Sequence, residues 1–223
     1  NINSFLDNAK KPNMAIVGGS KISTKIQLLN NLIEQFSVVA IGGAMANTFL
    51  LANNYNVGKS LVEKDLIQEA NNIQLKAKKS NCELILPTDV LCGKNINDTN
   101  PVNRNIHEMS PEEMILDIGE TSTEFINNKI INSKMVLWNG PVGAFEFQPY
   151  DKATNAIANV IKVHAKKLNI NTLAGGGDTV SAIKNTNSED GFNYISNAGG
   201  AFLEWLEGNE SPGVKSLKEN ILT

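Results

Sequence analysis

One short stretch combines glycine, a carboxylate and a hydroxyl in a pattern suited to a phosphorylated ligand. Residues 171–180 read Asn-Thr-Leu-Ala-Gly-Gly-Gly-Asp-Thr-Val, so an apolar run ends in three glycines before Asp178 and Thr179. Glycine lets the backbone approach a ligand closely, and the unpaired N–H groups at a helix start suit an anion. Asp178 would repel a phosphate unless a cation such as Mg²⁺ lies between them. The stretch therefore predicts a metal–nucleotide site, with an ordinary helix-capping aspartate as the alternative.

Two lysines, Lys21 and Lys25, follow an earlier glycine pair and form a second candidate phosphate contact. Residues four apart share one face of a helix, so both ammonium groups could reach one ligand if the helix begins early enough. A pair of solvated surface lysines is the alternative. The spacing matches neither the P-loop pattern nor the Gly-x-Gly-x-x-Gly dinucleotide fingerprint.

The other ionisable candidates suit ligand positioning better than attack on a substrate. Glu146 follows a glycine- and proline-rich stretch and could accept hydrogen bonds from ribose hydroxyls, with a surface glutamate as the alternative. Asp89 and Asp117 lie at predicted strand ends and rank low as functional groups. His107 and His164 have no partner pattern, so no Ser-His-Asp or Cys-His set can be assembled. Groups that position and neutralise phosphate match the needs of phosphoryl transfer.

Short apolar runs that alternate with helical patterns must position these groups. Strands are predicted over 14–17, 38–41, 83–86, 114–117, 135–138, 171–174 and 194–196. Helices are predicted over 24–36, 48–53, 62–79, 122–131, 149–168, 178–185 and 201–206. The segment 91–106 is predicted to be a loop or a short irregular hairpin.

This alternation predicts an α/β fold: a three-layer, doubly wound, Rossmann-like parallel sheet with helices on both faces, in a single domain. In open α/β sheets the ligand lies beyond the carboxyl ends of the strands. Glycines at several of those ends predict one long shared cleft.

Composition excludes several partners. With a net charge of -3 over 223 residues, the chain has no bulk basic field for nucleic acid. No apolar run approaches the roughly 20 residues that a membrane span needs, and residues 1–10 show no signal-peptide pattern. Cys82 and Cys92 form no metal or disulfide pattern, which fits a reducing cytosol. We expect a cytoplasmic protein without a nucleic-acid or membrane partner.

Six blocks, in this order, resemble the C-terminal, nucleotide-binding half of phosphoglycerate kinase. They cover residues 18–25, 42–49, 86–89, 138–146, 175–179 and 199–208. The combination of Trp138-Asn-Gly-Pro141 with Gly175-Gly-Gly-Asp-Thr179 is highly specific, and the match runs from about residue 12 to about residue 214. The resemblance implies reversible transfer of a phosphoryl group in glycolysis, with Mg²⁺. In that reaction 1,3-bisphosphoglycerate and ADP give 3-phosphoglycerate and ATP.

The resemblance also implies a role for each matching position. Lys21 and Lys25 would contact the nucleotide phosphates and the transferring phosphoryl group, and Gly199 and Gly200 would face that group from a helix start. The positions implied to line or hold the base and ribose are Gly19, Gly43, Ala44, Leu116, Asn139, Pro141 and Glu146. The positions implied to hold the phosphates are Gly176, Gly177, Asp178 and Thr179, with Asp178 on the metal.

In this family a separate N-terminal domain carries the basic patch for phosphoglycerate and a catalytic arginine. Residues 1–13 are expected to be a linker or interdomain helix remnant, 14–210 the nucleotide-binding domain, and 211–223 a tail that packs on that other domain. Arg104, the sole arginine, lies in the loop segment. We therefore expect a monomer that binds Mg-nucleotide but turns over little or nothing without the N-terminal domain.

Small departures from the family pattern leave nucleotide binding in place. Ala44 and Ala198 replace glycines that are frequent in the family, and both changes are small for small. Glu120 stands where a proline is common, and nothing in the sequence explains it.

Two other functions stay open. A dinucleotide-binding oxidoreductase domain would use a similar sheet, but the missing fingerprint and the presence of Lys21 and Lys25 argue against it. A non-catalytic nucleotide-binding module is the second alternative. Retention of Lys25, Glu146 and Asp178 argues against loss of the site.

Overall fold

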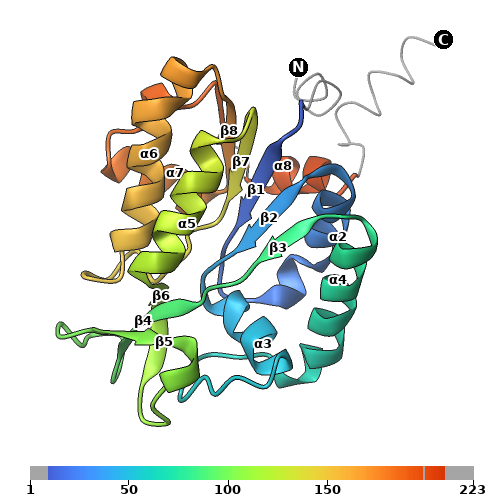
Figure 1. The fold of residues 1–223 in the computed structure, drawn as a ribbon. Helices are drawn as coiled ribbons and strands as arrows, with labels where there is room; N and C mark the ends of the chain where they lie inside the picture. The colour runs from blue at the N-terminus through green and yellow to red at the C-terminus, as the bar shows by residue number, and fades with distance from the viewer. Residues whose placement is uncertain (1–9, 198, 209–223) are drawn as a thin grey trace.

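A six-stranded parallel sheet forms the centre of the molecule in the computed structural model, which describes residues 10–197 and 199–208 (Figure 1). Its order is β3-β2-β1-β7-β8-β9, and every neighbouring pair is parallel. The strands are β1 (Asn13–Val17), β2 (Val38–Ile41), β3 (Glu83–Ile85), β7 (Met135–Asn139), β8 (Asn171–Gly175) and β9 (Tyr194–Ser196). The expected tail, 211–223, and most of the expected linker, 1–13, lie outside the described residues.

Helices cover both faces of this sheet, which confirms the predicted three layers. One face carries α2 (Ile26–Gln35), α3 (Ala44–Ala52), α4 (Ile67–Lys79) and α8 (Gly199–Leu206). The other carries α5 (Glu120–Ile131), α6 (Lys152–Leu168) and α7 (Gly177–Asn185). Because side chains alternate along a strand, Ala15 and Val17 enter the first core while Met14 and Ile16 enter the second. None of the helices in the described residues has the length and apolar character of a membrane span.

Several helix starts differ from the prediction. The helix predicted over 48–53 begins earlier, at Ala44, directly after Gly43. Two short 3-10 turns directly precede helices: η1 (Ile22–Thr24) before α2 and η2 (Lys64–Leu66) before α4. Two more lie elsewhere: η3 (Ile106–Glu108) follows β5, and η4 (Glu189–Gly191) precedes β9. Apolar periodicity does not distinguish a 3-10 turn from the first turn of an α-helix, so the pattern places the starts of α2 and α4 too early.

A second, antiparallel sheet was missed by the alternation rule. Its strands are β4 (Asp89–Gly93), β5 (Val102–Asn105) and β6 (Met114–Ile118), in the order β5-β4-β6. The strand predicted over 114–117 therefore belongs to this sheet, since β6 pairs antiparallel with β4. Of the two structures predicted for 91–106, the hairpin is correct, because β4 pairs with β5. An apolar run predicts a strand but does not name its partner.

The strand order places a topological switch point between β1 and β7. From β1 the chain continues to β2 and β3 on one side of the sheet, while β8 and β9 extend the other side beyond β7. Loops that follow the two central strands leave the sheet in opposite directions, which opens a crevice at their carboxyl ends. The fold thus directs a ligand to the segments that follow Val17 and Asn139.

Candidate functional site

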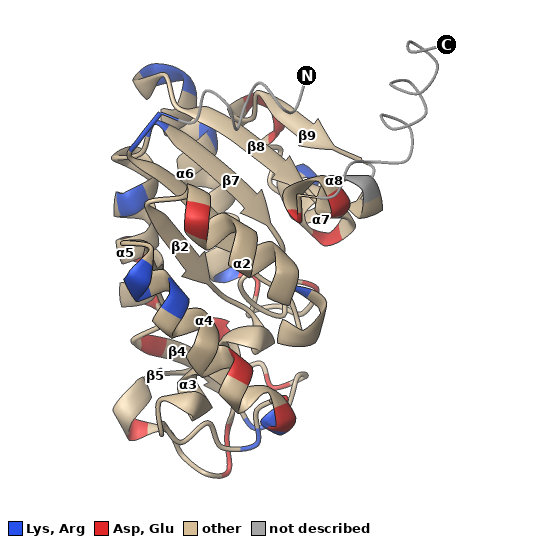
Figure 2. Cartoon of the chain, turned by 90° about the vertical axis from the view of Figure 1, so that its right-hand side faces the viewer, with Lys and Arg blue, Asp and Glu red and all other residues tan. Residues whose placement is uncertain are grey.

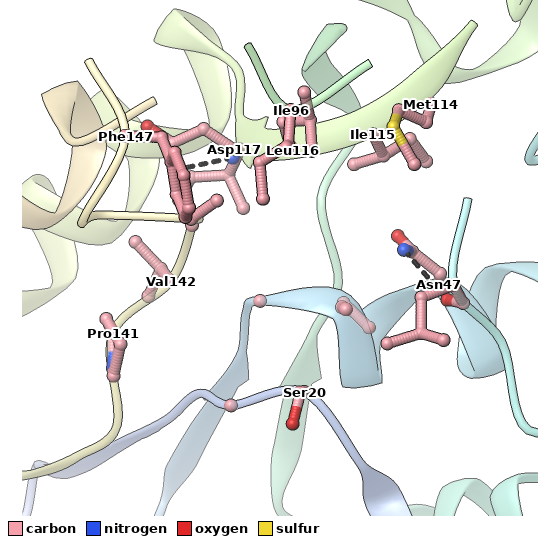
Figure 3. A pocket seen from close by; sticks show the side chains of 18 of the residues that line it. Ser20, Asn47, Ile96, Met114, Ile115, Leu116, Asp117, Pro141, Val142 and Phe147 are labelled. Carbon is pink, nitrogen blue, oxygen red and sulfur yellow. Dashed lines mark hydrogen bonds between the residues drawn. The ribbon is translucent and has the colours of Figure 1, made fainter. Parts of the chain in front are cut away.

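A cavity of about 460 Å³ lies at the predicted edge, between the loops after β1, β2 and β7 and strand β6 (Figure 3). Seven of the predicted site residues line it: Gly19, Gly43, Ala44, Leu116, Pro141, Glu146 and Asp178. The other predicted residues lie outside its lining: Lys21, Lys25, Asn139, Gly176, Gly177, Thr179, Gly199 and Gly200. The predicted site residues therefore fall into two groups: those that line the cavity and those that lie outside its lining.

Glycine turns pack backbone against backbone at the floor of this cavity. The amide of Gly43 donates to the carbonyl of Val142 at 2.7 Å, and Met45 donates to the carbonyl of Gly19 at 3.0 Å. Gly43 has a φ of 68°, and a Cβ added there would lie 2.5 Å from the Gly19 carbonyl oxygen. Glycine is required at this position by both conformation and space. Backbone hydrogen bonds thus join the turns after β1, β2 and β7.

Lys25 occupies a half-buried position beside the ends of β7 and β8. Its ammonium group donates to Oδ1 of Asn139, and Nδ2 of the same residue donates to the Gly175 carbonyl at 2.7 Å. Burial lowers the pKa of Lys25, and the charges of Glu207 and Asp178 oppose that shift. A partly desolvated cation at a strand end provides a contact for an anion.

Lys21 and Lys25 would share a helix face only if the helix began early enough, and the structure does not meet that condition. Lys21 precedes η1 in extended conformation, and Lys25 is the residue before α2, which begins only at Ile26. The 3-10 turn lies between the two lysines in the chain; Lys21 is exposed and Lys25 is half-buried. A four-residue spacing places two side chains on one helix face only if both residues belong to the same α-helix.

The first turns of α7 and α8 converge next to Lys25. Gly176, the residue before α7, has a φ of 100°, and a Cβ on Gly199 would lie 3.6 Å from its Cα. A Cβ on Gly177 would meet nothing within 4 Å. Thr179 is buried, and its hydroxyl accepts a hydrogen bond from the amide of Gly140 at 2.7 Å. The Thr179 side chain therefore fixes α7 to the loop after β7.

Asp178 is the exposed carboxylate in the first turn of α7 and lines the cavity. Acidic positions colour α7 and α8 where the two helices lie together (Figure 2). Among residues 10–197 and 199–208, no three His, Cys, Asp or Glu side chains group as a metal site. One carboxylate does not suit an all-protein cage. It does suit Mg²⁺, which takes one or two carboxylates and completes its octahedron with water and substrate phosphates.

Apolar side chains form the part of the cavity beside β6, and most of them were missed by sequence reasoning. Leu61, Ile96 and Phe147 line it although their exposed fractions are 53%, 37% and 39%. The amide of Ala144 donates to the Leu116 carbonyl at 2.7 Å, which ties the loop after β7 to this wall. Isolated apolar residues in loops carry no periodic signal. An exposed apolar wall suits a flat, weakly polar ligand group.

Asp117, which ranked low in the sequence, lies buried in the cavity wall with an exposed fraction of 2%. One carboxyl oxygen accepts from the amide of Ile118 at 2.9 Å, and the other accepts from the amide of Ala153 at 3.0 Å. Burial raises the pKa of this carboxyl to about 8. Asp117 therefore joins β6 to the first turn of α6, directly behind the cavity.

Asp89, the other low-ranked carboxylate, has a structural role. It begins β4, and its oxygens accept from the amides of Ser122 at 2.7 Å and Thr121 at 3.0 Å. These are amides of the first turn of α5, so Asp89 satisfies donors that would otherwise lack partners.

Fold and site together define a doubly wound α/β protein with a ligand cavity at its switch point. A family model described as phosphoglycerate kinase matches residues 1–209, and the chain belongs to the phosphoglycerate kinase family. A phosphoglycerate kinase of Rhodospirillum centenum is 46% identical over 209 residues, which cover 93% of this chain and 53% of the relative. A phosphoglycerate kinase of Brucella melitensis is 46% identical over 215 residues, covering 96% and 54%.

Solved structures agree with that assignment. Phosphoglycerate kinase from Coxiella burnetii matches with a TM-score of 0.93 and 37% identity, over 98% of this chain and 56% of that one. The phosphoglycerate kinase from Pyrococcus horikoshii, at 22% identity and a TM-score of 0.81, shows the shared fold. The chain spans about half the length of the curated relatives it matches.

Proposed function

We propose that this chain is the C-terminal, nucleotide-binding half of a phosphoglycerate kinase and holds Mg-ADP or Mg-ATP at the switch point. The arrangement of the cleft supports this most strongly. Apolar residues of β6 offer a wall for the base, while Lys25 and the glycine-rich start of α7 offer contacts for phosphates. A nucleotide has the same division between an apolar base and an anionic chain.

Each group then has a part in binding. Gly19, Gly43 and Ala44 with Leu116 and Pro141 line the base and ribose region, and Glu146 accepts from ribose hydroxyls. The amides of Gly176 to Thr179 with Lys25 and Lys21 hold the phosphates. Asn139 is buried and already bonded at both ends, so it positions Lys25. Asp178 supplies the protein ligand to Mg²⁺, which neutralises charge on the phosphates when bound.

The proposed reaction is phosphoryl transfer from 1,3-bisphosphoglycerate to ADP, giving 3-phosphoglycerate and ATP, and its reverse. The bond from the acyl phosphate oxygen to phosphorus breaks as a terminal ADP oxygen bonds to that phosphorus. Gly199 and Gly200 face the transferred group at the start of α8, with Lys21 as the third catalytic group. A separate N-terminal domain supplies the phosphoglycerate site, so the chain by itself binds nucleotide with little or no turnover in the cytoplasm.

Isothermal titration calorimetry of the chain with ADP in Mg²⁺ tests the proposal. We expect one saturable site, and no comparable site for NADH, which an oxidoreductase domain would bind. Absence of ADP binding by a folded chain, as judged by circular dichroism, would refute a nucleotide site. A near-normal rate in a coupled kinase assay would refute the need for a second domain.

A further inference from the structure

A polar side chain of α3 lies among apolar groups at one end of the cavity. Asn47, on α3, is fully buried and lines the cavity together with Leu61 and Ile115. Figure 3 shows its side chain on the wall opposite Pro141 and Val142. A buried amide among apolar groups is costly unless its donors and acceptors find partners. Asn47 therefore has a chemical role that an apolar residue would not fill.

The orientation of this amide is fixed by one hydrogen bond. Nδ2 of Asn47 donates to the carbonyl oxygen of Leu61 at 3.2 Å. A rotated amide would place Oδ1 against that carbonyl, and two acceptors would face each other. The nitrogen is therefore held on the Leu61 side, and the oxygen is the free end.

The free end lacks a partner within the protein. Oδ1 of Asn47 is buried and has no hydrogen-bond partner among the described residues. Leaving a buried acceptor unpaired is unfavourable, so a ligand group that donates to it gains more than one that does not. A ligand with a hydrogen-bond donor at this position therefore binds more tightly than one with an acceptor there.

On the basis of the proposed function, we infer that Asn47 selects the base of the nucleotide. The base is the flat part of the ligand and belongs against the apolar residues of β6, which share this end of the cavity with Asn47 (Figure 3). A 6-amino purine carries an N–H donor on its edge, whereas a 6-oxo purine carries an acceptor at the same atom. Asn47 accepts from the amino group, so adenine nucleotides bind in preference to hypoxanthine nucleotides.

The test compares Mg²⁺ complexes of ADP, inosine diphosphate and purine riboside diphosphate, which lacks any group at C6, by calorimetry. We expect the wild-type chain to bind ADP about tenfold more tightly than either analogue, which is the contribution of about one buried hydrogen bond. Asn47→Leu should reduce the ratio to about twofold by weakening ADP alone. Asn53→Leu, an exposed position at the end of the same helix, should keep the wild-type ratio.

Equal binding of the three nucleotides by the wild-type chain would overturn this inference and leave the nucleotide site intact. A tenfold ratio that persists in Asn47→Leu would assign the selectivity to another group. Failure of all three nucleotides to bind would instead refute the proposed function, and the inference with it. The wild-type comparison decides the question even if Asn47→Leu does not fold.

Discussion

Lys25 donates a hydrogen bond to the side-chain oxygen of Asn139, and this contact joins the segment after β1 to the end of β7. These two strands flank the switch point of the sheet. Asn139 is buried and is anchored in turn to the carbonyl of Gly175. The lysine is thereby held beside the start of α7, at the cost of partial desolvation of its charge.

Lys25→Met should separate binding from stability. Because burial lowers the pKa of Lys25, its charged form costs folding free energy at neutral pH. We expect the free energy of unfolding at pH 7 to change little, because relief of this cost offsets the loss of the hydrogen bond to Asn139. The dissociation constant of Mg-ADP should rise about tenfold or more, since a charge-assisted contact contributes about 1.5–3 kcal/mol. Urea denaturation and calorimetry measure the two quantities.

Lys184→Met, an exposed change at the last turn of α7, is the control and should leave affinity unchanged. A Lys25→Met protein that is less stable but binds Mg-ADP normally would show that the lysine is structural.

Gly177→Ala should weaken binding without harming the fold. A Cβ there meets no protein atom within 4 Å, and the residue lies in the first turn of α7. Stability should change by no more than about 0.5 kcal/mol. The added methyl group would stand where phosphates approach the helix start, so the affinity for Mg-ADP should fall. Normal affinity would mean that the ligand does not approach this turn.

Gly43→Ala is the matched change at a crowded glycine. Its Cβ would lie 2.5 Å from the Gly19 carbonyl oxygen, and the φ of 68° disfavours alanine. We expect a loss of about 1–3 kcal/mol of stability by urea denaturation. If Gly43→Ala and Gly177→Ala lose equal stability, the difference in space around these two glycines does not determine the effect of a Cβ.

Asp178→Ala should affect the metal complex more than the free nucleotide. The exposed carboxylate is the proposed protein ligand to Mg²⁺, and without metal it would repel phosphate. Affinity for Mg-ADP should drop while affinity for ADP in a chelator stays equal or rises. Asp190→Ala, in η4 and away from the cavity, controls for the change of net charge. An equal loss with and without Mg²⁺ would contradict the metal role.

Asp117 predicts a pH dependence of stability. Its pKa is raised to about 8 in the folded chain and is about 3.9 in an unfolded one. The folded state therefore holds a proton that the unfolded state releases, so this contribution is complete below about pH 4 and is lost as pH rises to about 8. The free energy of unfolding falls by at most about 1.4 kcal/mol per pH unit through this group.

Asp117→Asn removes the titration, because an amide stays neutral at both pH values. Between pH 5.5 and pH 8.5, the wild-type chain should lose a few kcal/mol more unfolding free energy than the variant, measured by urea denaturation. Parallel losses in the two proteins would mean that Asp117 is already ionised at the lower pH.

Local sequence patterns predicted the strands that are followed by a glycine turn, because an apolar run that ends at Gly18 or Gly175 is typical of few other local structures. They did not predict the partner of β6, which depends on the hairpin formed by β4 and β5. The same limit applies to Lys21, because a 3-10 turn and a helical turn have the same local composition.

Some of the cavity residues could be predicted from the sequence, and others could not. Gly43 and Asp178 lie in motifs at strand ends and were predicted, whereas Asn47 lies inside a helix whose residues look like core. Its importance comes from an unpaired oxygen, and only the packed structure reveals that. Asp117 ranked low for the same reason, since its burial depends on how α6 packs on β6.

A crystal structure of the chain with Mg-ADP would show where the nucleotide binds. We expect the base against Leu116, the phosphates at the amides of Gly176 to Thr179 with Lys25, and Mg²⁺ between Asp178 and the phosphates. A nucleotide bound outside the cavity, or one whose phosphates lie at β6 and whose base lies at α7, would contradict this expectation.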